Sequence, residues 1–133
     1  MLDAELKNLS QARLAHAKDC LHEAEILYAA NEYKGTANRS YYAAFHAMRA
    51  VLILDGFDSK KHSGIIAKFR ELYIKTDLFD RNVSDAISSL FRVRSASDYD
   101  DFYIVSKQDA QLQLEHAKMM VSLIANYLQT RQI

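Results

Sequence analysis

Residues 38–56 carry side chains that could together bind a phosphate and a base. Arg39, Tyr42, His46 and Arg49 are spaced by three, four and three residues, so on a helix they lie along one face. Guanidinium groups can donate paired hydrogen bonds to a phosphate, and an aromatic ring can stack on a base. The alternative, which the spacing alone favours, is structural: the arginines reach solvent while Tyr42 and His46 pack where two helices cross.

A second unusual segment, residues 91–103, places an arginine where an apolar residue is expected. Arg94 continues the apolar series of the preceding helical turns and therefore points toward the core, where arginine is seldom found without a partner. Asp98 follows four residues later and could pair with Arg94 if the helix continues that far. Two interpretations stay open: a structural ion pair, or a polar pocket shared with Arg39 and His46.

Other candidate binding groups have weaker support in the sequence. His62 precedes an expected helix, where it could contact an anion at the helix N-terminus, although an ordinary loop histidine is the commoner case. The acidic run 98–101 lacks the ligand spacing and the glycine turn of a calcium loop. The pair His22-Glu23 begins like a zinc-binding helix, but Ile26 stands where the second histidine is needed. We therefore expect no metal and no cofactor.

The composition is that of an ordinary globular domain, with 133 residues of which 50% are hydrophobic and 26% are charged. Lys plus Arg equals Asp plus Glu, 17 against 17. No overall field attracts nucleic acid, so RNA binding would need a local basic patch, while a net charge near zero favours self-association.

The one cysteine, Cys20, cannot close an internal disulfide and lies among apolar neighbours as a core residue would. Since no segment suits a signal peptide or a membrane span, we expect a cytoplasmic protein with no membrane partner.

Helices must position these side chains, because apolar residues recur every three or four positions and no segment alternates like a strand. Glycines are expected to separate the helices, and small polar residues to cap two of them. The expected helices cover about residues 4–31, 36–55, a segment after the N-cap Ser63, a segment from the N-cap Asp80, and 107–131, with Gly35, Gly56 and Gly64 between helices. The fold class is therefore all-α, an up-and-down bundle of four to five helices in a single domain, residues 1–133.

Two further expectations concern which helical faces are buried. The fourth helix should bury a face made of Val83, Ile87, Leu90 and Phe91, whereas His16 and His116, among polar neighbours, should be exposed. The fifth helix carries a second apolar edge, which marks either a central helix or a subunit interface. That edge consists of Leu112, Met119, Met120, Leu123 and Tyr127.

The segment Asn38-Arg39-Ser40-Tyr41-Tyr42-Ala43-Ala44-Phe45-His46-Ala47 is very similar to the signature of the HEPN-domain family, in particular its small stand-alone UPF0332-like branch. His62 before a helix and the pattern Arg94…Asp98-Tyr99 resemble that branch too. The resemblance spans nearly the whole chain. It implies a bundle of four or five helices, usually homodimeric and often accompanied by a minimal nucleotidyltransferase in toxin–antitoxin or related stress and defence systems.

Many proteins of that family are metal-independent ribonucleases with an arginine followed, after four to six residues, by a histidine. The histidine can move the 2′-hydroxyl proton and the arginine can stabilise charge on the phosphoryl group. After Arg94 this chain instead has Tyr99, Asp100 and Asp101 at the candidate positions. Tyrosine, with an ordinary pKa of about 10, is a poor proton acceptor near neutral pH. Arg94 therefore matches the arginine of the ribonuclease motif, but no residue matches its histidine. Ribonuclease activity would require the fold to bring another histidine close to Arg94.

The leading interpretation is a HEPN-type helical homodimer with little or no catalysis of its own. It would bind a nucleotide or RNA, or partner a nucleotidyltransferase. An endoribonuclease toxin with an altered site, in which Arg94 and His46 are catalytic, is one alternative, and a purely structural interaction module is another. The binding residues expected under the leading interpretation are Arg39, Tyr42, Arg49, His62, Asp98 and Tyr99.

Overall fold

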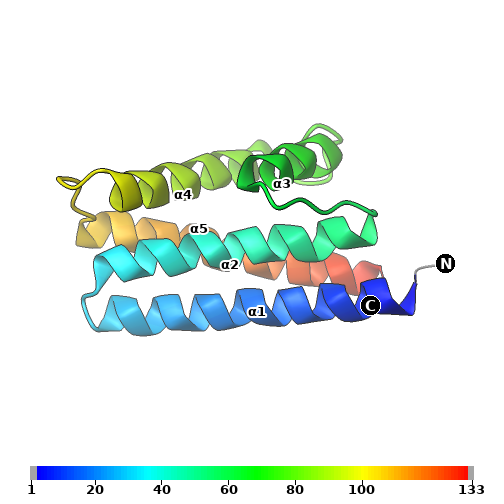
Figure 1. Ribbon diagram of the computed structural model, residues 1–133, viewed down its shortest axis with the longest axis horizontal. Coiled ribbons are helices and arrows are strands. Elements are labelled where there is room, and N and C mark those ends of the chain that lie inside the picture. The colour runs from blue at the N-terminus through cyan, green and yellow to red at the C-terminus, as the bar shows by residue number, and fades with distance from the viewer. Residues whose placement is uncertain (1–2, 132–133) are drawn as a thin grey trace.

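The computed structural model describes residues 3–131, and within that range the chain is helical with no strand. The expected all-α bundle of four to five helices is confirmed. None of the described helices is both long and apolar enough to cross a membrane. The elements are α1 (Ala4–Ala29), α2 (Tyr33–Leu54), α3 (His62–Phe69), the π-helical turn η1 (Arg70–Ile74), α4 (Arg81–Tyr99) and α5 (Lys107–Thr130) (Figure 1).

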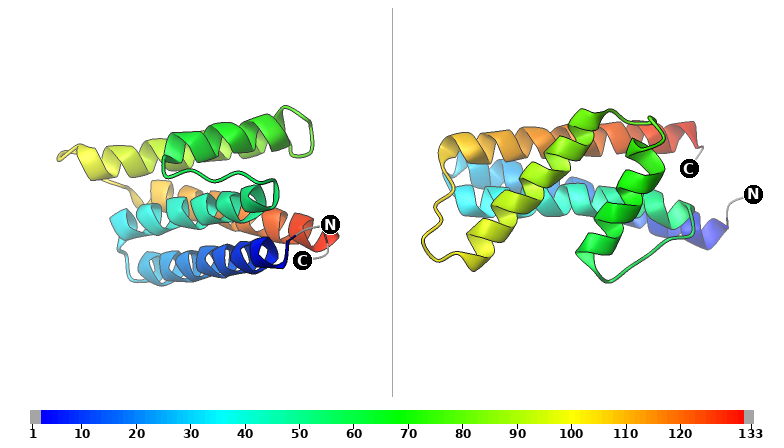
Figure 2. Two further views of the ribbon diagram at one scale, coloured as in Figure 1. Left: turned by 45° about the vertical axis from the view of Figure 1, so that its right-hand side comes forward. Right: turned by 90° about the horizontal axis from the view of Figure 1, so that it is seen from above.

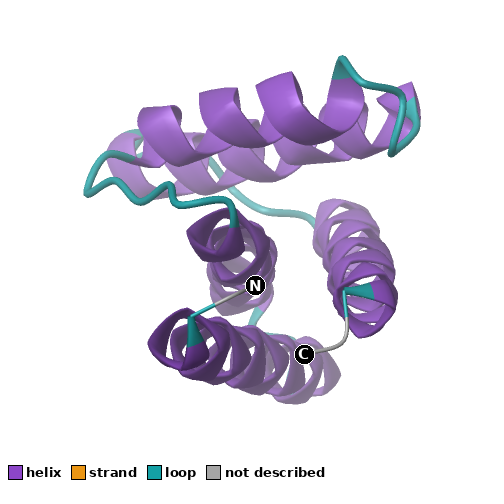
Figure 3. Ribbon diagram, turned by 90° about the vertical axis from the view of Figure 1, so that its right-hand side faces the viewer, coloured by secondary structure: helices purple, strands orange, loops and turns teal. Residues whose placement is uncertain are grey.

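The helices form two layers around α2. Helices α1, α2 and α5 lie alongside one another, and α3 and α4 cross above α2 and α5 at an angle (Figure 2, right). The view along the helices shows the same upper layer over α2 and α5, with α1 on the far side of α2 (Figure 3). Helix α2 packs against α1, α3, α4 and α5. Because it is enclosed on several sides, α2 is the element best able to hold side chains in fixed positions.

Small residues explain why α2 can occupy this central position. Alanine favours helix formation and its short side chain lets neighbouring helices approach closely. Between these alanines, Tyr41, Met48 and Leu52 are at most 1% exposed and fill the space toward the other helices. The alanines of α2 that are at most 2% exposed are Ala37, Ala43, Ala44, Ala47 and Ala50.

The connection between α1 and α2 differs from the expectation. Helix α2 begins at Tyr33, so the helix boundary predicted at Gly35 is wrong. Asn31, with φ 64°, makes the turn instead. A Cβ atom at Gly35 would lie 3.0 Å from Cδ1 of Leu27, so this glycine serves close packing of the two helices. The expected boundary at Gly56 is confirmed. Gly56 lies just after the end of α2 and has a φ of 77°, a left-handed conformation that glycine adopts readily.

The start of α3 also differs, and this changes the setting of one candidate residue. The helix begins at His62 with Lys61 at the N-cap, so the predicted cap at Ser63 is wrong. Gly64 lies inside the first turn, where a Cβ atom would approach Oγ of Ser59 to 2.9 Å. Since the preceding loop packs so closely on this turn, His62 is held as a helical residue and is not a free loop histidine.

Helix α4 begins after Asp80, which occupies the expected N-cap position. Its buried face contains Val83, Ile87 and Leu90, as expected, each at most 2% exposed. Phe91 is 41% exposed, so its expected burial is wrong. One residue beyond Leu90 turns the side chain about 100° around the helix and away from the core.

The second apolar edge of α5 is largely covered within the chain. Met120 is fully buried, and Met119, Leu123 and Tyr127 pack as half-buried residues against the core, leaving Leu112 45% exposed. The central helix is α2, and most of this edge needs no partner subunit to cover it. On the same helix His116 is half-buried, so its expected exposure is wrong, and burial lowers its pKa.

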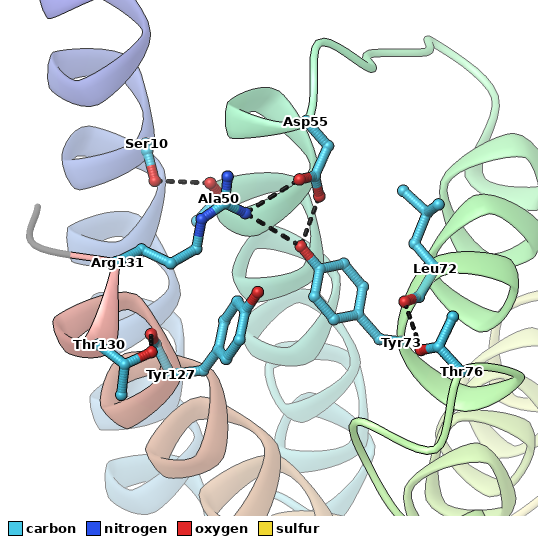
Figure 4. A network of polar contacts seen from close by, with 9 residues as sticks. All are labelled: Ser10, Ala50, Asp55, Leu72, Tyr73, Thr76, Tyr127, Thr130 and Arg131. Carbon is cyan, nitrogen blue, oxygen red and sulfur yellow. Dashed lines mark hydrogen bonds and ion pairs between the residues drawn. The ribbon is translucent and has the colours of Figure 1, made fainter. Parts of the chain in front are cut away.

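A polar network closes the end of the bundle where α2 and α5 stop (Figure 4). The hydroxyl of Tyr73, on η1, donates a hydrogen bond to Oδ2 of Asp55 at 2.5 Å. Arg131 Nη1 donates to Oδ1 of Asp55 at 2.9 Å and to Oη of Tyr73 at 3.3 Å. Burial, together with the Asp55 carboxylate, raises the pKa of Tyr73. The network therefore ties three elements that are far apart in the sequence.

Candidate nucleic-acid site

The four residues expected on one face of α2 separate into two cavities. Tyr42, His46 and Arg49 line a cleft of about 600 Å³. Arg39 lines a different cavity of about 430 Å³, together with Asp98. The Arg39 guanidinium carbon lies 5.2 Å from the centre of the Tyr42 ring, so this ring stands between the two cavities. The predicted single face is therefore present, but Arg39 does not share the cleft with His46.

The larger cleft, called the α2 cleft below, lies between α2 and the segment that leads into α3. Its wall on α2 is mainly aromatic, and the opposite wall is polar and charged. These two chemistries suit the bases and the phosphates of a nucleic acid, respectively. The α2 cleft is lined by Tyr42, Phe45, His46, Arg49, Asp58, Ser59, Lys60 and His62.

Arginines surround the one carboxylate of the α2 cleft. Arg13 Nη2 lies 2.8 Å from Oδ2 of Asp58, and Arg49 Nη2 lies 3.6 Å from Oδ1. Burial acts to raise the pKa of Asp58, but hydrogen bonds from Arg13 and from the Ser59 amide hold it below its usual value. The carboxylate thus stays ionised and holds the arginines in place. With Lys60 also on the lining, the cationic groups outnumber Asp58.

Two imidazoles of the α2 cleft are uncharged near neutral pH. Burial, with contributions from His16 and Arg49, lowers the pKa of His46 to about 4. Burial, then Arg94 and Arg49, lowers the pKa of His62 as well. A neutral imidazole can accept a proton or a hydrogen bond, so both rings are chemically able to act as acceptors toward a bound hydroxyl.

Arg94 is held by side chains of α2 and of its own helix. Its Nη2 donates a hydrogen bond to the hydroxyl of Tyr42 at 2.9 Å, and its Nε lies 2.9 Å from Oδ2 of Asp98. The Nε–H makes no aligned hydrogen bond with this carboxylate, so the contact is an ion pair only. The guanidinium carbon lies 5.2 Å from the ring centre of Tyr41 and 5.3 Å from that of Tyr42. The side chain is only 14% exposed, and the ion pair with Asp98 that the structural interpretation expects is present.

The fold brings Arg94 near one histidine through a residue that the sequence analysis did not single out. Tyr41 is 1% exposed, and its hydroxyl lies 2.8 Å from Nδ1 of His62. Because the Arg94 guanidinium covers the same ring, Tyr41 links the two residues. Burial raises the pKa of Tyr41 to about 12, so its hydroxyl keeps its proton. The available signal was a tyrosine at a core position, whose hydroxyl must find a partner.

The remaining predicted residue lies apart from this cluster. Tyr99 ends α4 and is 79% exposed, five residues after Arg94. Asp100 and Asp101 follow in an exposed loop, where Asp100 Oδ1 accepts a hydrogen bond from the amide of Phe102. The structure therefore brings together at the α2 cleft the residues Tyr42, His46, Arg49 and His62. Arg94 contacts this group through the Tyr42 hydroxyl, and Arg39 and Asp98 lie beside a second cavity.

Comparison with known proteins identifies the family. A protein of Methanocaldococcus jannaschii with the name "Putative toxin MJ0142" is 26% identical over 133 residues, which is 100% of this chain and 90% of that protein. A UPF0332 protein of Archaeoglobus fulgidus is 32% identical over 116 residues, 87% of this chain and 92% of its own. A UPF0332 protein of Thermotoga maritima is 25% identical over 113 residues, 85% and 86% of the two chains. The HEPN domain model matches residues 10–127, and the chain therefore belongs to the HEPN domain family, as the signature in its second helix predicted.

Proposed function

We propose that this protein binds single-stranded RNA in the α2 cleft and acts as the HEPN component of a toxin–antitoxin or defence pair, with little or no catalysis of its own. The observation that carries the proposal is the lining of this cleft. The half-buried ring of Tyr42 offers an aromatic surface for a base, while Arg49 and Lys60 offer cations for phosphates. The net charge of zero makes such a local cluster necessary, because the molecule as a whole does not attract a polyanion.

The test is the affinity for a fluorescently labelled single-stranded RNA, followed by fluorescence anisotropy over a range of salt concentrations. Lys60→Ala should weaken binding and reduce the slope of log K against log salt by about 0.7, the share of one phosphate contact. Tyr42→Ala should weaken binding by about 1–3 kcal/mol if one base stacks on this ring. Lys118→Ala, which removes an exposed charge on α5, serves as the matched control. An equal effect of Lys60→Ala and Lys118→Ala would exclude the α2 cleft as the binding site.

The toxin–antitoxin assignment draws on the relative from Methanocaldococcus jannaschii that carries the word toxin in its name. The family resemblance adds the kind of partner, a minimal nucleotidyltransferase, and a homodimeric state. Exposed apolar residues after α4, Phe102 at 93% and Ile104 at 84%, are candidates for the dimer contact. Expression of this protein alone should slow growth, and coexpression of the proposed nucleotidyltransferase partner should restore it. Growth that is unaffected by expression would contradict the toxin assignment.

A specific observation favours a second candidate, a metal-independent endoribonuclease. Tyr41 links Arg94 to His62, so a neutral imidazole lies near the arginine although no histidine follows it at the family spacing. If His62 is the base, the wild-type protein should cleave RNA in the presence of chelator, and His62→Ala should abolish cleavage. Under the leading proposal the wild-type protein has little activity, and Tyr99→His should create or raise cleavage that Arg94→Ala then removes. Wild-type cleavage that Tyr99→His does not alter would favour the second candidate.

A further inference from the structure

Three side chains with metal-binding atoms meet where α1 packs on α2. Of the three, only His46 also lines the α2 cleft of the proposed function. His16 and Cys20 lie one turn apart on α1, and His46 faces them from α2. One donor atom from each side chain can be chosen so that all three lie within 4.8 Å of one another. The rings of His16 and His46 are stacked, with centres 4.0 Å apart and planes at 21°. The sequence offered no sign of this cluster, because only the packing of the two helices brings residues 16, 20 and 46 together.

The donor atoms of this cluster are incompletely used within the described chain. Cys20 is 1% exposed and is a free thiol. Nδ1 of His46 is buried and has no hydrogen-bond partner among residues 3–131. A buried polar atom without a partner is unfavourable by about 1–3 kcal/mol and calls for an explanation. A bound ion would supply the missing partner.

We propose that His16, Cys20 and His46 form a binding site for a thiophilic divalent transition metal ion, with Zn²⁺ as the ion whose preferences fit the donors best. Two imidazoles and one thiolate are the nitrogen and sulfur donors that zinc takes in tetrahedral sites. Three protein ligands leave the fourth position to water or to an external ligand. The donors come from two helices, so the ion would join α1 to α2. This inference departs from the metal-free protein expected from the sequence.

The geometry requires one modest adjustment. With Zn–N of about 2.0–2.1 Å and Zn–S of about 2.3 Å, tetrahedral donors lie about 3.3–3.6 Å apart. Since the donors lie within 4.8 Å of one another, they must approach by at most about 1.5 Å, and the stacked rings must open so that both can direct a nitrogen at the ion. His16 is on the exposed side of α1 and is free to make this rotation, whereas Cys20 is buried and His46 is half-buried. The exposed His16 also provides the route of entry.

The charges around the cluster act in both directions. Arg39 Nη1 lies 3.9 Å from Sγ of Cys20, and Arg39 and Arg49 both oppose a proton on His46. Those guanidiniums repel a cation, but they also favour the neutral imidazole, which is the form that binds metal. Burial raises the pKa of the Cys20 thiol, and Arg39 acts in the opposite direction, toward the thiolate that binds metal. Asp19 and Glu23 supply negative charge near Cys20, and Glu23 lies 3.6 Å from Arg39. The carboxylates thus offset part of the repulsion.

The experiment uses the full chain after treatment with a chelator and a thiol reductant. Isothermal titration with ZnCl₂ should show one site per chain, and CoCl₂ should give the near-ultraviolet thiolate-to-cobalt absorption band together with the visible bands of tetrahedral cobalt. His16→Gln should weaken zinc binding by about tenfold or more, at least as much as the loss of a group that merely supports a ligand. Because His16 is exposed, this variant should stay folded, which circular dichroism checks.

Cys20→Ser provides the second variant, and it should remove the thiolate band completely. His22→Gln is the matched control, since it replaces another exposed histidine of α1 and should leave zinc affinity unchanged. The proposal is overturned if no stoichiometric zinc binds, if cobalt binds without a thiolate band, or if His22→Gln weakens zinc binding as much as His16→Gln does. None of these readouts depends on RNA binding, so the proposal of a metal site and the proposal of RNA binding in the α2 cleft are tested independently.

Discussion

Replacing Arg94 by alanine should lower the free energy of unfolding substantially, because this side chain joins α4 to α2. The substitution removes the hydrogen bond to Tyr42, the ion pair with Asp98 and the packing of the guanidinium on Tyr41 and Tyr42. It also leaves the Tyr42 hydroxyl without its donor.

The magnitude follows from the exposure of each partner. A hydrogen bond that involves a charged group contributes about 1.5–3 kcal/mol, and each cation–π contact at a partly exposed site about 0.5–1 kcal/mol. Removing one member of a fully buried ion pair costs about 3–5 kcal/mol. Asp98 is 26% exposed, however, and water can hydrate it once Arg94 is gone, so its share is about 1 kcal/mol or less. Since these contributions overlap, we expect a loss of about 2–4 kcal/mol.

Urea denaturation followed by circular dichroism measures this loss, and thermal melting gives a second estimate. For a domain of this size, each kcal/mol corresponds to about 3–5 °C in the melting temperature. Arg92→Ala is the matched control, because Arg92 is exposed on the same helix, and its loss should change stability by about 0.5 kcal/mol or less. Equal stabilities of the two variants, with RNA affinity reduced only by Arg94→Ala, would refute the structural role and make Arg94 a direct contact to the ligand.

Three further outcomes are expected. Tyr73→Phe, which removes the hydrogen bond to Asp55, should lower the free energy of unfolding by about 1–2 kcal/mol in urea denaturation; an unchanged midpoint would contradict a stabilising network. The pKa of His46 is about 4 in the folded chain and about 6.5 when unfolded, so the unfolded chain binds more protons between these values. The free energy of unfolding should therefore fall by about 2 kcal/mol as the pH drops from about 6.5 to about 4, after allowance for partial exposure of the ring. His46→Gln should flatten this part of the pH curve. Identical pH profiles of the two proteins would contradict the lowered pKa of His46. Light scattering should give twice the monomer mass of 15.2 kDa, and the double change Phe102→Ser and Ile104→Ser should shift it to the monomer; a monomer at every dilution of the wild-type protein would exclude the homodimer.

Local patterns in the sequence determined the helices and one of the important contacts. Apolar residues at intervals of three and four predicted every α-helix, because one face of each helix must be buried whatever its neighbours are. The same periodicity directed Arg94 toward the core, and the spacing of four residues gave its pairing with Asp98. The helix boundaries predicted at Gly35 and Ser63 were wrong. The turn before α2 is made at Asn31, and the start of α3 is fixed by the loop before His62, which packs on the first turn of that helix.

Tertiary structure decided which of the candidate residues share a site. Helical spacing places Arg39 and His46 on one face of α2, but it says nothing of which neighbouring helix or loop covers each part of that face. The loop before α3 covers the end with His46 and Arg49, and so forms the α2 cleft, while Arg39 lies beside another cavity. The link from Arg94 through Tyr41 to His62 likewise joins three separate helices. Such contacts depend on how helices distant in sequence pack together, and periodicity within one helix carries no information about them.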